Sequence, residues 1–344
     1  MCSSFPYVWG AGRQAILSTR IDRILSQGWV AGRPGVSLKI IKNDLTLYQR
    51  TKGLADIQEN RPIAQDTIFA LASITKPMTA VAIFQLLERG RLSLDDRLGK
   101  WISNLPCEWR DVTIGQLLSH QSRISFKGIQ VEDGMSNRDV LKAVMDLKRL
   151  WALSNEPFGY GNGAYILLAE VIEKASGLSY ADYLQAHVFN VANMDGASVH
   201  PKPNQTDRPM ARNYGVSTMI YGRNDFLTGA MGVYASTVDL ERFSRALLAG
   251  KLISPASLQL MTSDQSHARV DRRFDSHYGY GWFVPPASQG GTIFWHSGGV
   301  DGFQSLLYID QPKGLIAILL GNGGEASVQV LNAVLAVVNK TYPD

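Results

Sequence analysis

Residues 73–77 read Ser-Ile-Thr-Lys-Pro, and they open a predicted helix that stops before Gly90. If this helix starts at Ser73, residues i and i+3 lie on one face, about one turn apart. The Lys76 amine then comes within reach of the Ser73 hydroxyl. Pro77 fits this placement because proline is tolerated in the first turn of a helix.

The Ser73–Lys76 pair is a candidate nucleophile and base. A serine hydroxyl attacks weakly unless a base removes its proton, and a lysine serves as that base when burial lowers its pKa. At a helix start the Ser73 backbone N–H has no intrahelical acceptor and is available to an oxyanion. The alternative is an N-cap serine with a surface lysine, because this spacing arises about once by chance in such a chain. Ser73 is the only serine that has Lys three residues on.

Residues 158–162 read Phe-Gly-Tyr-Gly-Asn and precede a helix expected over residues 164–175. Tyr160 and Asn162 project the same way if this loop is extended. The Tyr160 phenol is able to relay a proton, and Asn162 supplies both a donor and an acceptor. The alternative is a glycine-rich turn with a packed tyrosine.

Residues 295–299 read Trp-His-Ser-Gly-Gly at the end of a strand expected over residues 292–296. The glycines let a substrate backbone approach closely and lend a peptide N–H to a site. His296 is placed to tune charge or pass protons. The other histidines are interpreted as satisfied or surface side chains: His120, His187, His200, His267 and His277. No histidine has a metal-ligand spacing, so no metal is expected. No organic cofactor is expected either.

Short apolar strands are expected near both ends of the chain, and helices in its middle. The expected strands cover 35–41, 45–50, 280–284, 292–296, 303–310 and 315–320. Terminal helices are expected over 12–28 and 327–339. We therefore predict one unit, 1–344, with an antiparallel sheet built from both ends. Its α/β subdomain covers about 1–75 and 235–344, and a helical subdomain covers about 76–234, with the site between them. The loops at 123–136 and 195–230 are expected to wall this site.

The composition excludes several classes of protein. The net charge is +4, from 34 basic and 30 acidic residues that are interspersed, so no basic stripe for nucleic acid is present. No run reaches the roughly 18–20 apolar residues that span a bilayer. Cys2 and Cys107 cannot build a disulfide framework, and neither lies beside a histidine as a thiol nucleophile requires.

The start of the chain bears on its compartment. Residues 1–12 lack the charged and apolar regions of a signal peptide, so the chain as given is expected to be cytoplasmic. If a leader had been removed, Cys2 followed by Ser3 and Ser4 would begin a processed lipoprotein, and a periplasmic or lipid-anchored protein is the alternative.

The order Ser-x-x-Lys, Tyr-x-Asn, His-x-Gly resembles that of the penicillin-recognising serine hydrolases. The similarity is to the branch with class C β-lactamases, D-alanyl-D-alanine carboxypeptidases, D-aminopeptidases and family VIII esterases. It extends over roughly residues 35–322. Further similar segments are 69–76, 117–120, 232–237, 278–282 and 296–303.

The resemblance implies a β-lactamase-like α/β (α+β) fold and a role for each motif. Ser73 would be acylated, with Lys76 and Tyr160 sharing the general base and acid roles. His296 would join them at the position that β-lactamases of this branch fill with lysine. Arg123 departs from the glycine usual at its position.

The same resemblance implies a substrate- and oxyanion-binding side formed by Asn162, Ser297, Gly298 and Gly299. Asn162 would orient the substrate or Lys76, and the backbone N–H groups of Ser73 and Gly299 would form the oxyanion hole.

The expected activity is that of a serine hydrolase that forms an acyl-enzyme on a small ester or peptide substrate, as a carboxylesterase or D-stereospecific peptidase does. Three alternatives stay open: a transacylase with the same site, a non-catalytic binding or scaffold protein, and a β-lactamase. His296 in place of lysine favours the esterases and peptidases. The sequence does not specify the substrate or the oligomeric state.

Overall fold

The protein is described here from a computed structural model. The structure describes residues 6–122, 124, 135–146, 158–201, 209–214, 227–271, 275–289, 292–300, 302–323 and 327–342. Cys2, Arg123 and large parts of the loops predicted to wall the site, 123–136 and 195–230, lie outside these residues.

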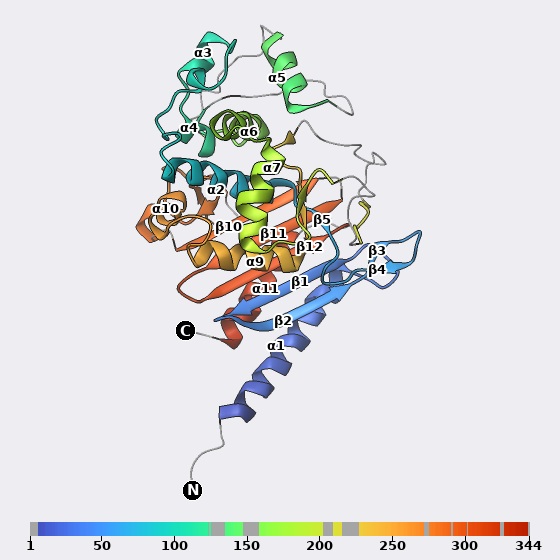
Figure 1. Cartoon of the computed structure of the whole chain (residues 1–344). Helices are drawn as coiled ribbons and strands as arrows, with labels where there is room; N and C mark the ends of the chain where they lie inside the picture. Colours follow the sequence, from blue (N-terminus) through green and yellow to red (C-terminus); the bar gives the residue numbers. More distant parts are fainter. Residues whose placement is uncertain are drawn as a thin grey trace.

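One seven-stranded antiparallel sheet is built from both ends of the chain, in the order β2-β1-β12-β11-β10-β9-β8 (Figure 1). Its strands are β1 (Val36–Lys42), β2 (Leu45–Lys52), β8 (His277–Tyr278), β9 (Phe283–Val284), β10 (Ile293–Val300), β11 (Phe303–Asp310) and β12 (Leu315–Gly321). The N-terminal hairpin joins the C-terminal strands where β1 pairs with β12. The prediction of a β-lactamase-like fold with one antiparallel sheet is confirmed.

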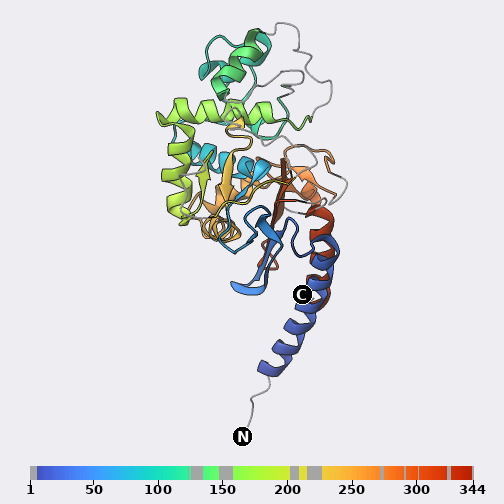
Figure 2. The ribbon, with the colours of Figure 1, turned by 90° about the vertical axis from the view of Figure 1, so that its right-hand side faces the viewer.

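The two terminal helices, α1 (Pro6–Gly28) and α11 (Ser327–Thr341), cover one face of this sheet (Figure 2). Side chains alternate between faces along a strand. In β12 the odd-numbered residues 315–319 therefore pack with the terminal helices, while the even-numbered residues 316–320 join the main core. The N-terminal part of α1 projects away from the body in both views. No helix in the described part of the chain is long and apolar enough to cross a membrane.

On the opposite face, α9 (Thr237–Leu248) lies against β1 and β12. Its start is fixed by a capping box in which Ser236 and Asp239 satisfy each other's backbone N–H groups, as the sequence pattern predicts. A buried ion pair between Lys39 of β1 and Glu241 of α9 ties the helix to the sheet.

The middle of the chain is mostly helical. Its long helices are α2 (Thr75–Glu88) and α6 (Asn162–Ser176), which pack on each other. The shorter ones are α3 (Cys107–Arg110), α4 (Ile114–Leu118), α5 (Asn137–Asp146), α7 (Tyr180–Leu184), α8 (Asn190–Ala192) and α10 (Pro255–Met261), with tighter or wider turns η1 (Ala72–Ile74), η2 (Leu98–Lys100), η3 (Gln185–Phe189) and η5 (Ala287–Gln289).

Two small sheets complete the fold, β3 (Leu54–Asp56) with β4 (Arg61–Pro62), and β5 (Phe69–Ala70) with β7 (Val233–Ala235) and β6 (Ser198–Val199). We propose that the division into two subdomains near residues 75 and 235 holds, and the antiparallel pairing of β5 with β7 at those two crossings supports it.

Two predicted strands are wrong in their bounds. Residues 280–284 were expected to form one strand, but Gly281 has φ +85° and turns the chain between β8 and β9. The strand expected to end at His296 continues as β10 through both glycines to Val300. It continues because β11 pairs with every residue of β10.

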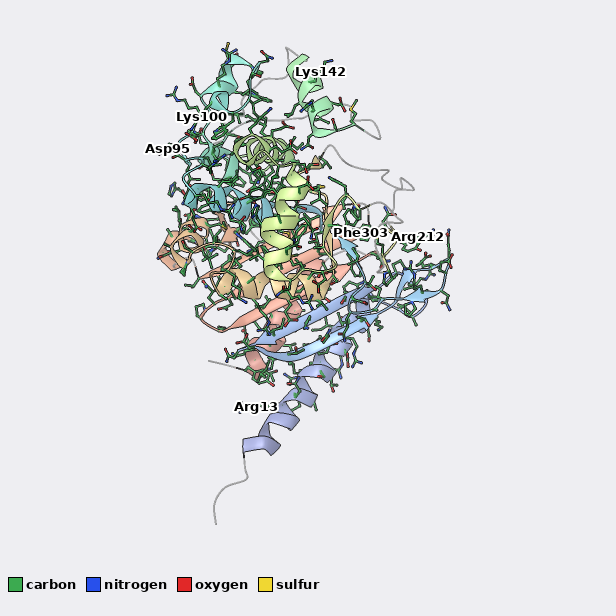
Figure 3. All side chains as sticks on the ribbon, in the orientation of Figure 1. Arg13, Asp95, Lys100, Lys142, Arg212 and Phe303 are labelled. Atoms are coloured by element: carbon green, nitrogen blue, oxygen red, sulfur yellow. The ribbon has the colours of Figure 1, made fainter. Side chains whose placement is uncertain are left out.

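Asn322 fastens the segment after β12 to three other parts of the chain. Its Oδ1 accepts the Gly35 N–H at 2.7 Å, and its Nδ2 donates to the carbonyls of Leu54, Ala55 and Arg212 at 2.9–3.2 Å. Arg212, labelled in Figure 3, also pairs with the buried Asp56 carboxylate at 2.7 Å. These polar contacts hold residues 209–214 against the end of β12 and against β3.

Asn322→Ala is expected to lower the free energy of unfolding by about 2–4 kcal/mol, because it leaves buried backbone groups unpaired. Chemical denaturation measures this loss. Asn339→Ala, at an exposed position of α11, is the control and is expected to stay within about 0.5 kcal/mol of wild type. Equal stability of the two variants would contradict the role of Asn322.

Candidate active site

The turn that carries Ser73 is held from two sides. β5 leads into it, and the Leu71 N–H bonds the Val233 carbonyl of β7 at 2.9 Å. From the main sheet, the Ser305 hydroxyl of β11 donates to the Leu71 carbonyl at 2.6 Å. Ala72 has φ +47°, a left-handed conformation that a non-glycine residue adopts only when its surroundings enforce it. The backbone strain thus lies directly before Ser73.

Lys76 is fully buried, and three groups surround its amine. Nζ lies 3.0 Å from Ser73 Oγ, 2.9 Å from Asn162 Oδ1 and 3.1 Å from the Ala230 carbonyl oxygen. Burial away from water lowers the pKa of Lys76 from its usual 10.5 to about 7. A neutral amine has two N–H donors and one lone pair. The amide and carbonyl oxygens take the two donors, so the lone pair is left for the Ser73 hydroxyl.

The carbonyl that contacts Lys76 sits in a tightly fitted loop. Thr79, one turn along α2, donates to the neighbouring Gly229 carbonyl at 2.7 Å. Gly229 has φ +89°, and a Cβ there would lie 2.3 Å from the Tyr165 carbonyl of α6. Only glycine fits between this loop and α6, so the Ala230 carbonyl is fixed in place.

Tyr160 stands beside the pair. Its ring centroid lies 4.9 Å from Lys76 Nζ. Tyr160 is 42% exposed as a residue. The surrounding protein nevertheless desolvates its phenol and raises the pKa of Tyr160, and a hydrogen bond with Ser73 acts to lower that pKa. The phenol is therefore protonated at neutral pH and is in contact with the candidate nucleophile.

β10 runs past the Ser73 turn, and its glycines allow the close approach. A Cβ on Gly298 would lie 2.3 Å from the Leu71 carbonyl and 2.9 Å from Ser73 N, whereas no described residue lies within 4 Å of a Cβ on Gly299. Among the described residues, β9 pairs with β10 only at Trp295. The edge from Ser297 onward is thus open towards the site.

His296 is buried, and both its ring nitrogens are bonded. Nδ1 lies 2.7 Å from the Ser297 carbonyl oxygen, which only accepts, so Nδ1 carries the proton. Nε2 then accepts from the Tyr278 hydroxyl at 3.1 Å. Burial and the nearby Lys76 lower the pKa of His296 to about 3. The ring is therefore neutral at physiological pH, and a role of His296 in passing protons stays a prediction.

His120 was interpreted from the sequence as an ordinary satisfied or surface histidine, and that interpretation is wrong. Its buried ring lies 4.4 Å from the Tyr160 ring, centroid to centroid. It also packs against Tyr165 and Tyr278. The segments 117–120 and 278–282 both carry the family resemblance, which was the available signal that these rings belong to the site.

Comparison with known proteins identifies the family of this chain. The profile of the family described as Beta-lactamase matches residues 21–340. The chain therefore belongs to the beta-lactamase family, and the resemblance to the penicillin-recognising serine hydrolases is confirmed.

Among the described residues no three His, Cys, Asp or Glu side chains gather as a metal site would require.

Individual proteins of known name are similar to this chain in sequence or in fold. The chain is 34% identical to penicillin-binding protein 4* of Bacillus subtilis over 295 residues, covering 78% of this chain but only 64% of that protein. It is 26% identical to esterase EstB of Burkholderia gladioli, covering 94% and 96% of the two chains. The D-amino acid amidase of Ochrobactrum anthropi is 20% identical, with a TM-score of 0.80 over 96% of this chain and 100% of that one, which shows a shared fold.

Gly298→Ala is expected to destabilise the fold by about 1–3 kcal/mol, because the added methyl group pushes β10 away from the Ser73 turn. Denaturant unfolding provides the measurement. Gly299→Ala is the matched control: no atom of the described residues lies within 4 Å of its Cβ position, so its stability is expected to change by less than about 0.5 kcal/mol. A Gly298→Ala protein as stable as this control would show that the close approach is not required.

Proposed function

We propose that the protein is a serine hydrolase that acts on an ester or an amide through an acyl-enzyme, with Ser73 as the nucleophile. The observation that carries this proposal is the buried Lys76 amine, 3.0 Å from Ser73 Oγ and with its other neighbours already acceptors. In this position the lone pair of neutral Lys76 is directed at the Ser73 hydroxyl, which needs a base to become a nucleophile.

In the first step, neutral Lys76 takes the Ser73 proton as Oγ attacks the substrate carbonyl carbon. The O–C bond forms, and the carbonyl oxygen becomes an oxyanion. The backbone N–H groups of Ser73 and Gly299 are proposed to bind this oxygen, which is supported by the short approach of β10 to the Ser73 turn and by the absence of any described residue within 4 Å of a Cβ on Gly299. Fixed donors of this kind stabilise developing charge without reorganisation.

In the second step, the tetrahedral carbon expels its alcohol or amine, which takes a proton. Tyr160 is proposed to relay it from Lys76, because its raised pKa keeps the phenol protonated. Water then attacks the ester carbon of acyl-Ser73, passes a proton back through the same groups, and releases the acid. Asn162 is proposed to orient Lys76, since its Oδ1 lies 2.9 Å from Nζ.

The substrate class follows from His296. Its Nδ1–H and Nε2 are both engaged within the protein, so the ring offers no N–H and no charge to a substrate carboxylate. Ser297, beside it on the open edge of β10, and Gly298 are uncharged as well. We propose esters or amides with no carboxylate next to the scissile bond, ahead of β-lactams. The similarity to an esterase over almost the full length of both chains supports this choice.

The rate constant kcat/KM for an activated neutral ester is expected to rise with pH and level off above a midpoint near 7, because only unprotonated Lys76 accepts the Ser73 proton. A pH–rate profile measures this. Lys76→Arg, which keeps a permanent charge, is expected to lose about 10²–10⁴-fold at every pH. A midpoint near the ordinary lysine value of 10.5 would contradict the buried base.

Intact-mass spectrometry tests the nucleophile. The wild-type protein is expected to gain one fluorophosphonate adduct and Ser73→Ala none. A separate penicillin incubation distinguishes the classes: a long-lived penicilloyl adduct favours a peptidase, and a fluorophosphonate adduct alone favours an esterase or transacylase. If neither reagent labels the folded wild type, a non-catalytic binding protein with this fold replaces the proposal.

A further inference from the structure

We propose that His120 is a positioning residue that holds Tyr160 at the Ser73–Lys76 pair. This inference rests on the proposed function. It gives a positioning role to His120, which takes no part in the proton transfers described above. His120 lies just after α4 and connects that helix to the loop that carries Tyr160.

His120 accepts hydrogen bonds from the loop on both sides of Tyr160, and we call this pair of bonds the clamp. The Gly159 N–H donates to the His120 carbonyl at 2.9 Å, and the Gly161 N–H donates to His120 Nδ1 at 3.4 Å. Between these two bonds the imidazole ring lies against the phenol ring, with centroids 4.4 Å apart. Two flanking glycines would leave such a loop free to change shape, so the clamp supplies the rigidity that the sequence of the loop lacks.

The bond from Gly161 fixes the tautomer of His120. A nitrogen that accepts a hydrogen bond carries no proton, so neutral His120 is protonated on Nε2. Nε2 is buried and has no hydrogen-bond partner among the described residues, and the ring packs against Tyr165 and Tyr278 at 5.1 Å and 5.0 Å. Aromatic faces accept an N–H weakly. The Nε2–H donor therefore gains little from its surroundings. We infer that the ring is retained for its other nitrogen, Nδ1, which accepts the Gly161 N–H.

The charge state of His120 agrees with this geometry. Burial first, then the nearby Lys76 and His296, hold the pKa of His120 well below its usual value. The ring therefore stays neutral, and the Gly161 bond persists over the pH range in which Lys76 titrates. The backbone at His120 has φ +58°, a left-handed conformation in which histidine and asparagine are both enriched.

Two substitutions separate the hydrogen bond from the ring. His120→Phe keeps a ring and removes the acceptor. His120→Asn removes the ring, keeps an acceptor oxygen in place of Nδ1 and suits the left-handed backbone. His267→Phe, at an exposed histidine with φ +52°, controls for phenylalanine in this conformation.

The readout is the rate of fluorophosphonate labelling of Ser73 in proteins shown to be folded by thermal melting. His120→Phe is expected to label about 10–100-fold more slowly, the effect of a small misplacement of a reacting group. His120→Asn is expected to regain about tenfold of that loss, and His267→Phe to label as wild type does. Wild-type labelling of His120→Phe, or equal rates for the Phe and Asn variants, would overturn the role of the bond.

A double-mutant cycle tests whether His120 acts through Tyr160. In a Tyr160→Phe background, which lacks the hydroxyl to be positioned, His120→Phe is expected to change the labelling rate by less than about twofold. The same loss in both backgrounds would assign His120 a purely structural role and overturn the proposal.

Amide exchange separates this inference from the proposed function. If wild type is not labelled at Ser73, the proposed function fails, and the clamp is judged by hydrogen exchange at the Gly161 amide. Protection in wild type and His120→Asn with fast exchange in His120→Phe supports the clamp. Equal exchange in all three proteins contradicts it.

Discussion

In the described part of the chain the Lys76 amine is buried without a carboxylate partner, and the rest of the site is arranged around this constraint. Removing a charged amine from water is unfavourable unless it is paired or neutralised. This protein supplies oxygen acceptors from α6 and from the 229–230 loop, but their partial charges do not replace a full counter-charge. The lowered pKa from 10.5 to about 7 corresponds to about 5 kcal/mol of disfavoured protonation. The fold sustains that penalty because α2, α6 and the sheet pack tightly on all sides.

Stretches far apart in the sequence meet at this amine, and each brings a different kind of group. The turn before α2 brings a hydroxyl, the loop before α6 brings a phenol and an amide, and β10 brings a bare backbone edge. Glycines recur at the meeting points because two main chains approach there more closely than a Cβ allows. Ala72, directly before Ser73, keeps a left-handed backbone conformation, which a folded chain retains where the surrounding structure enforces it.

Periodicity and motif spacing predicted much of this arrangement. The i, i+3 spacing of Ser73 and Lys76, the supply of strands by both ends of the chain and the capping pattern of Ser236 with Asp239 are each present in the structure. The Ala230 carbonyl was not predictable, since a backbone acceptor leaves no mark on the side-chain sequence. The role proposed for His120 was not predicted, because it depends on a turn conformation and on aromatic neighbours from three other segments. The two-residue strands β8 and β9 are too short to show a period.

The sheet also has a consequence for synthesis on the ribosome. β1 is paired on one edge by its hairpin partner β2 and on the other by β12, which lies near the opposite end of the chain. A nascent chain therefore carries an apolar strand with one unpaired edge until β12 has been made. Such edges are templates for pairing with other chains, and closing so long a loop slows folding. Shielding of that edge while translation proceeds therefore favours folding over aggregation.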